Sequence, residues 1–110
     1  MADVTLTLDG DPESVTLATT TVRRIVVPNG CRSLIFSSSI DWYEQNDATQ
    51  AIADGAAITA ADAKLIPAGL WSSQPTPPKS ATTPWPQHYV LAYGSAAGTL
   101  YVQASSRRIR

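Results

Sequence analysis

The sequence has little of several residue types, and each shortage excludes a class of protein. Its single cysteine, Cys31, cannot form a disulfide within the chain, which excludes a secreted fold held by a disulfide framework. Charged residues make up only 15% of the 110 residues and leave a formal net charge of −1, which argues against a nucleic-acid-binding surface. So sparsely charged a surface suits a protein that works inside an assembly.

Features of a secreted, membrane or metal-binding protein are also lacking. Residues 1–13 contain neither a basic stretch nor a long apolar run, so we expect no signal peptide, no membrane span and synthesis in the cytoplasm. No two His, Cys, Asp or Glu residues recur at the spacing of metal ligands, so we expect no metal ion and no other cofactor. The length predicts one domain over residues 1–110.

Nucleophilic catalysis has one formal set of candidates. The only histidine, His88, together with Cys31 and Asp41, offers the residue types of a catalytic triad. Nothing in their spacing supports a triad, and lone cysteine and histidine residues at strand ends are more often packing or surface residues. We therefore expect a protein that is not an enzyme, with Cys31 as a small buried apolar residue.

What the sequence does contain is a series of short β-strands separated by turns. Runs with alternating or β-branched residues predict strands at residues 3–8, 14–19, 22–27, 32–38, 40–44, 64–66, 70–72, 88–93 and 99–105. Residues 46–63 are rich in Ala, Asp and Gly, and we expect a loop there rather than one helical turn around residues 60–64. The pattern predicts an all-β single domain, a β-sandwich with jelly-roll-like or immunoglobulin-like connections.

Some of these runs flank turn signals. Pro28-Asn29-Gly30 suits a tight turn, so we expect the strands on its two sides to form a hairpin. Residues 88–93 and 99–105 flank a small, glycine-containing segment and predict a second hairpin. Pro67-Ala68-Gly69 separates two runs that we expect to be short edge strands.

Two segments without strand character supply the candidate partner contacts. Residues 74–87 hold five of the eight prolines and predict a long extended loop, because proline cannot donate to a sheet ladder. Trp85 in this loop is either a partner anchor or a cap on one end of the sandwich. Residues 106–110 form a basic tail that is either solvated or a contact for an acidic partner, for example the acidic N-terminal segment of a neighbouring subunit. The candidate partner-binding residues are Pro78, Pro84, Trp85, Pro86, Arg107, Arg108 and Arg110.

The aromatic side chains allow a second kind of binding site. Three tryptophans and four tyrosines are enough for a stacking platform of the kind that binds sugars: Trp42, Trp71, Trp85, Tyr43, Tyr89, Tyr93 and Tyr101. Aromatic residues dominate burial in small β domains, however, so we expect most of these side chains in the core or at an interface.

Several stretches together resemble small virion structural proteins of tailed bacteriophages, above all their capsid decoration (cementing) proteins. These stretches are RRIVVPNGCRSLIFSSSIDWY at residues 23–43, Asp54-Gly55-Ala56-Ala57, Ile66-Pro67-Ala68-Gly69 and the closing YVLAYGSAAGTLYVQASS at residues 89–106. The likeness covers most of the chain, and it is one of overall pattern rather than of a short diagnostic motif.

The resemblance implies a jelly-roll or immunoglobulin-like domain that binds the capsid exterior as a homo-oligomer, often a trimer, and stabilises the shell by bridging capsomers. Its partners would be the major capsid protein or other virion proteins, its location the virion, and the family offers no catalytic residues. Two alternatives stay open, namely a tail or head-to-tail accessory protein and a carbohydrate- or receptor-binding β-module.

Overall fold

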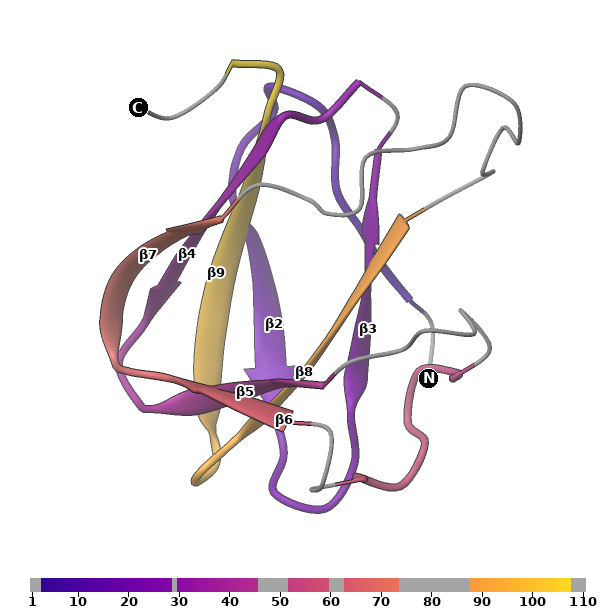
Figure 1. Cartoon of the computed structure of the whole chain (residues 1–110), viewed down its shortest axis with the longest axis vertical. Helices are drawn as coiled ribbons and strands as arrows, with labels where there is room; N and C mark the ends of the chain where they lie inside the picture. The colour runs from indigo at the N-terminus through magenta and orange to yellow at the C-terminus, as the bar shows by residue number, and fades with distance from the viewer. Residues whose placement is uncertain (1–2, 29, 46–51, 60–62, 74–87, 108–110) are drawn as a thin grey trace.

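A computed structural model describes residues 3–28, 30–45, 52–59, 63–73 and 88–107. These residues form β-strands joined by turns and irregular segments, without a helix (Figure 1). The strands are Val4–Thr5 (β1), Glu13–Leu17 (β2), Arg23–Val27 (β3), Ser33–Ser38 (β4), Trp42–Gln45 (β5), Ala63–Ile66 (β6), Gly69–Ser73 (β7), His88–Gly94 (β8) and Gly98–Ser105 (β9). The prediction of an all-β domain is confirmed.

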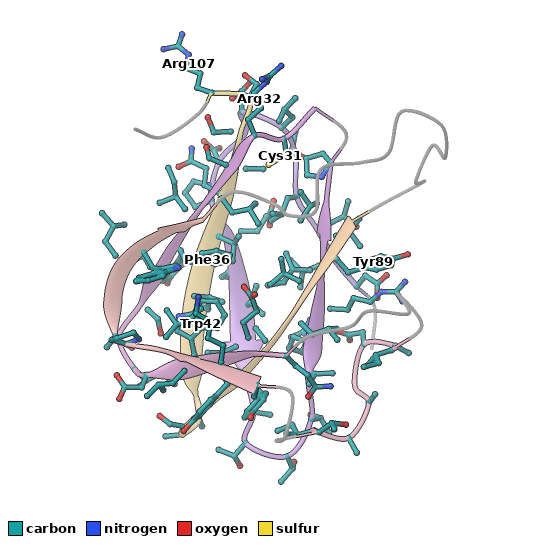
Figure 2. The ribbon with its side chains drawn as sticks, in the orientation of Figure 1. Cys31, Arg32, Phe36, Trp42, Tyr89 and Arg107 are labelled. Atoms are coloured by element: carbon teal, nitrogen blue, oxygen red, sulfur yellow. The ribbon has the colours of Figure 1, made fainter. Side chains whose placement is uncertain are left out.

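The strands form two sheets that share one apolar core. One sheet has five strands in the order β1-β3-β8-β5-β6, and the other has four in the order β2-β9-β4-β7. Alternate residues of both sheets point between them, as the pleat requires. The buried core consists of Leu6, Val15, Leu17, Ile25, Val27, Leu34, Phe36, Trp42, Ile66, Val90, Ala92, Leu100, Val102 and Ala104. Figure 2 shows Phe36 and Trp42 between the sheets, where their ring centroids lie 5.0 Å apart.

The pairing of the strands is nested from the ends of the chain towards its middle. Strand β2 pairs antiparallel with β9, β3 with β8, β4 with β7 and β5 with β6. The chain is therefore one long hairpin with arms β2 to β5 and β6 to β9. Because β9 also pairs with β4, and β8 with β5, this long hairpin is rolled into two sheets.

The two predicted hairpins are wrong, because each pair of strands is divided between the sheets. Strands β3 and β8 belong to the five-stranded sheet, whereas β4 and β9 belong to the four-stranded one. The turn after β3 does form, with the Cys31 N–H donating to the Pro28 carbonyl at 3.3 Å and Gly30 at a φ of 84°. Alternation identifies a strand and its apolar face but does not say which sheet it joins.

The connection from β8 to β9 shows why a crossing between sheets suits this sequence. A Cβ atom at Gly98 would lie 2.6 Å from Ile40 Cδ1, and one at Gly94 would lie 2.3 Å from the Ala96 carbonyl oxygen. At Gly94 the obstacle is backbone, so only glycine fits there, whereas a side chain at Gly98 would force the end of Ile40 to shift. The glycines therefore let the chain bend tightly over Ile40 as it passes from one sheet to the other.

Other strand predictions fare better. The run at residues 40–44 corresponds to β5, and those at 64–66 and 70–72 correspond to β6 and β7, which are edge strands as expected. The run at residues 3–8 is a paired strand only in β1. Beyond it, the chain leaves β3 and reaches β9, where Leu8 bridges to Ala104. Residues 52–59 are irregular, as expected for a loop, and β6 begins at Ala63. Residues 60–62, within the expected loop, and the proline-rich segment at residues 74–87 lie outside the described residues.

Candidate protein-binding face and edge

Most of the candidate contacts predicted from the sequence lie outside the described residues. This applies to Pro78, Pro84, Trp85, Pro86, Arg108 and Arg110. Arg107 is described and exposed, at the same end of the molecule as Arg32 (Figure 2). Its N–H donates to Ser105 Oγ at 3.1 Å and its carbonyl accepts from Ser33 Oγ at 2.5 Å. These contacts fix the backbone of Arg107 and leave its guanidinium at the surface.

Acidic residues near the N-terminus meet their partners within one chain. Asp9 accepts hydrogen bonds from the Ser106 N–H at 2.9 Å and from Ser106 Oγ at 2.7 Å. These bonds to the carboxylate hold the pKa of Asp9 below its usual value. Asp3 forms an ion pair with Arg24 at 2.9 Å. Both carboxylates are therefore engaged within the subunit, and the expected pairing of termini between subunits finds no support in these two residues.

The three residues of the formal catalytic triad do not come together. His88 is the first residue of β8, whereas Asp41 lies at the other end of that strand, where its carbonyl accepts from the Ser95 N–H at 3.1 Å. A seven-residue strand spans roughly 20 Å. Asp41 Oδ1 accepts instead from the Ala68 N–H at 2.8 Å, and Cys31 Sγ donates to the Ser33 carbonyl at 3.1 Å.

The outer face of the five-stranded sheet is covered by residues 52–59, and we call it the covered face. A second apolar cluster lies there, with Val22, Leu91 and Tyr93 buried at its centre. The rings of Tyr43 and Tyr93 stack with centroids 4.9 Å apart. The side chains packed around this centre are Tyr43, Ile52, Ala56, Ile58 and Ala63. Burial of these groups stabilises the sheet and shields the part of this face around β8 from solvent.

Charged side chains fasten the covering segment to β3. Asp54, whose side chain is only 2% exposed, accepts from Arg23 Nε at 3.1 Å and from the Arg24 N–H at 2.7 Å through one oxygen. Arg24 also donates to the Ile52 carbonyl at 3.3 Å, and its guanidinium lies 4.0 Å from the centroid of the Tyr89 ring. A buried carboxylate that pairs with arginine and a backbone N–H holds a segment in one place.

The outer face of the four-stranded sheet carries no such layer among the described residues, and we call it the open face. The register of the strands puts uncharged residues on it: Ser14, Thr16, Ile35, Ser37, Leu70, Thr99, Tyr101 and Gln103. One row across the sheet runs Ser14, Tyr101, Ser37, Leu70, in which Tyr101 is 51% and Leu70 78% exposed. The open face is thus a mixed surface of hydroxyl and apolar groups, without a charge on its described strands.

A second exposed apolar feature is the margin formed by β6 and β7. Leu65 on β6 is 52% exposed, and on β7 Trp71 is 38% exposed beside Leu70. Trp71 pairs with Phe36, so it lies on the core side of the sheet. The Lys64 ammonium lies 5.7 Å from the centroid of the Trp71 ring and spans the gap between the margins of the two sheets. This interaction is weak at an exposed site.

One acidic group points between the sheets near this margin. Glu44 is opposite Ala92 and Lys64, on the core side of the five-stranded sheet. Burial raises the pKa of Glu44, and the positive charge of Lys64 opposes that shift only in part. Glu44 is therefore easier to protonate in the folded chain than in the unfolded chain.

The described aromatic residues do not form one stacking platform. Trp42 is in the core, Tyr43 and Tyr93 are under the covering segment, and Trp71 and Tyr101 lie on opposite sides of the four-stranded sheet. Sequence reasoning did not single out Leu70, and it named Tyr101 only as one of seven aromatic candidates for a stacking platform. Alternation along each strand puts neighbouring residues on opposite faces of the sheet. Only the sheet register shows which of the two faces is exposed.

No protein-family model, no curated protein and no solved structure matches the chain. Within the ranges that the structure describes, no helix has the length and apolar character needed to cross a membrane. The same ranges contain no group of three or more His, Cys, Asp or Glu side chains placed to hold a metal ion. The case for a function therefore depends on the covered face, the open face and the β6–β7 margin.

Proposed function

We propose that this chain is a non-enzymatic virion structural protein of a tailed bacteriophage, which binds the capsid exterior as a decoration protein. The observation that carries this proposal is the open face, an uncharged sheet surface with Tyr101 and Leu70 exposed at its centre and edge. Aromatic side chains that remain exposed on a folded domain are enriched at the centres of protein interfaces. The chain's resemblance to decoration proteins supplies the identity of the partner.

The order of the strands supports a jelly roll as the fold of this module. In a jelly roll, one long antiparallel hairpin is rolled into two four-stranded sheets, and viral capsid and lectin domains use this architecture. The nested pairs β2–β9, β3–β8, β4–β7 and β5–β6 follow that scheme, with β1 added beside β3. In an immunoglobulin-like fold, several consecutive strands pair as hairpins within one sheet. Among the described strands here, β5 and β6 are the one pair of consecutive strands that are neighbours in a sheet.

A decoration protein acts by binding and not by chemistry. A molecule that binds the assembled lattice better than its free subunits stabilises the lattice by mass action. Bridging two capsomers adds avidity, because the second contact forms at a high effective concentration. An open sheet face meets this need, since it offers a broad contact surface and the low charge of the chain limits repulsion between neighbouring copies.

Co-sedimentation with capsids of the phage that encodes the protein tests the proposal. We expect the protein to pellet with capsids and to raise the temperature at which the capsids break open. The Tyr101→Lys variant should bind at least about tenfold more weakly, because it removes an interface aromatic and puts a charge in the contact. The Ala53→Lys variant adds the same charge on an exposed residue of the covering segment and should bind like the wild type.

Two results would overturn the proposal. Wild-type protein that does not pellet with capsids, although correctly folded, would exclude decoration and favour a tail or head-to-tail accessory role. Equal loss of binding in the Tyr101→Lys and Ala53→Lys variants would show that charge, and not the open face, controls binding.

A further inference from the structure

Four strands lie at sheet edges, and they differ in how they are protected from pairing with another chain. Natural edge strands are blunted by shortness, by charged residues or by proline. Strand β1 has only two residues, β2 begins with Glu13 after Pro12, and β6 contains the exposed Lys64. Strand β7, with the sequence GLWSS, has five residues and contains none of these devices.

Exposure on β7 is also unusual for an edge strand. Leu70 is 78% exposed on the open face, and Trp71 is 38% exposed on the core side. Figure 1 shows β7 at the outer margin of the four-stranded sheet, with β4 as its one neighbour. One side of its backbone therefore lacks a strand partner within the described residues, and large apolar side chains flank it.

We propose that β7 pairs antiparallel with β7 of a second copy of this chain and joins the two four-stranded sheets into one continuous sheet. The interface would be isologous, as in most homodimers. The inference deepens the proposed function, because the joined sheet would double the open face presented to a capsid, and its biological meaning rests on that function.

Symmetry restricts the register of such a pair. A two-fold axis perpendicular to the sheet keeps every residue on its own face, so directly opposed residues must both be odd or both be even along the strand. The axis therefore lies midway between one residue and the same residue of the second copy. The register that pairs all five residues of β7 has its axis at Trp71. Trp71 then meets Trp71 of the second copy, and Leu70 lies opposite residue 72.

The chemistry of β7 fits a second copy better than it fits a charged partner. No residue of the strand carries a charge, so two copies meet without like-charge repulsion. An aromatic pair at the axis is a favourable cross-strand contact. The Lys64 ammonium, already over the Trp71 ring, remains beside it and does not enter the strand pair.

The solution mass of the purified protein, measured by light scattering coupled to gel filtration, tests the pairing without any capsid. We expect the mass of two copies for the wild type and of one copy for Leu70→Lys. The matched control is Tyr101→Lys, which puts the same charge in the same row of the open face but on the inner strand β9. It should keep the mass of two copies, and circular dichroism checks that each variant is folded.

Cross-linking then tests the register, in a Cys31→Ser background that removes the native thiol. Directly opposed residues of antiparallel strands have Cα atoms about 4.5–5.5 Å apart, within reach of a disulfide. Diagonal neighbours lie about 7–8 Å apart, beyond it. Trp71→Cys should therefore form a covalent dimer on oxidation, whereas Leu70→Cys, which would face its own copy diagonally, should not.

Each contrary outcome has a distinct meaning. A monomeric wild type at every concentration would overturn the pairing, and would indicate that another segment or a different protein covers β7. A trimer would overturn it in favour of the oligomer that the resemblance implies. A dimeric Leu70→Lys variant would exclude β7 as the interface, and cross-linking of Leu70→Cys alone would exclude the register. None of these results bears on capsid binding by the open face, which the Tyr101→Lys variant tests separately.

Discussion

The two sheets have outer faces of opposite character. Strand β8 puts large apolar side chains on the covered face, and residues 52–59 lie over them. Strands β4 and β9 place mainly hydroxyl and amide groups on the open face, where Tyr101 is the largest exposed side chain. A face rich in large apolar groups needs a second layer, whereas a face of serine and threonine tolerates water. The composition of each face thus decides which one is left for a partner.

The largest expected effect breaks the covered face. Leu91→Ala removes a fully buried side chain under the covering segment and should lower the free energy of unfolding by about 2–4 kcal/mol, because it also leaves a cavity. Tyr101→Ala, on the open face, should change it by no more than about 0.5 kcal/mol. Urea titrations of both variants measure the difference, and equal losses would mean that the open face is also packed.

A smaller effect is expected when the fastening of the covering segment is removed. Asp54→Ala deletes the acceptor of the Arg23 and Arg24 bonds and should cost about 1–3 kcal/mol. Hydrogen exchange should accelerate at the amides of Val22 and Gly55, which bond across this junction. The control is Asp41→Ala, which loses an exposed bond to Ala68 and should leave these amides unchanged. Unaltered exchange in Asp54→Ala would show that apolar packing alone holds the segment.

The third prediction concerns Glu44, which lies on the core side of the five-stranded sheet near the β6–β7 margin. Because its pKa is raised in the folded chain, the native state binds the proton more tightly than the unfolded state does. Stability from this group is then greatest at low pH and falls as pH rises from about the ordinary glutamate pKa of 4.5 through the raised pKa. Glu44→Gln should therefore raise the melting temperature at pH 7 and reduce this pH dependence. A lower melting temperature at pH 7 would mean that its attraction to Lys64 outweighs burial.

Sequence patterns located the strands far better than they located the partners of those strands. Alternation along residues 99–105 marks β9 and its inward residues, because the pleat has a period of two. The glycine-containing segment between β8 and β9 predicts that these two strands pair, although β9 pairs with β2 and β4. Pairing between distant strands depends on how the whole chain rolls up, and a short turn signal does not contain that information.

The candidate site was less predictable than the fold for a related reason. The prediction from composition was a sparsely charged surface, and the open face agrees with it. The partner contacts that the sequence predicts belong to the proline-rich segment and the basic tail, which mostly lie outside the described residues. Leu70 and Tyr101 are 31 residues apart in sequence, and only the register through β4 brings them into one row. Local reasoning cannot find such a neighbourhood.

The nested strand order has a consequence for how the protein is made. Strand β9 lies between β2 and β4, and β8 lies between β3 and β5, so the last strands of the described chain sit in the middle of each sheet. A ribosome releases β2 long before β9, and until then neither β2 nor β4 has its inner neighbour. Contacts between such distant residues make folding slow, on the order of milliseconds to seconds. Neither sheet is complete until β8 and β9 have been made, and until then the early strands have open edges that a chaperone or another copy can reach.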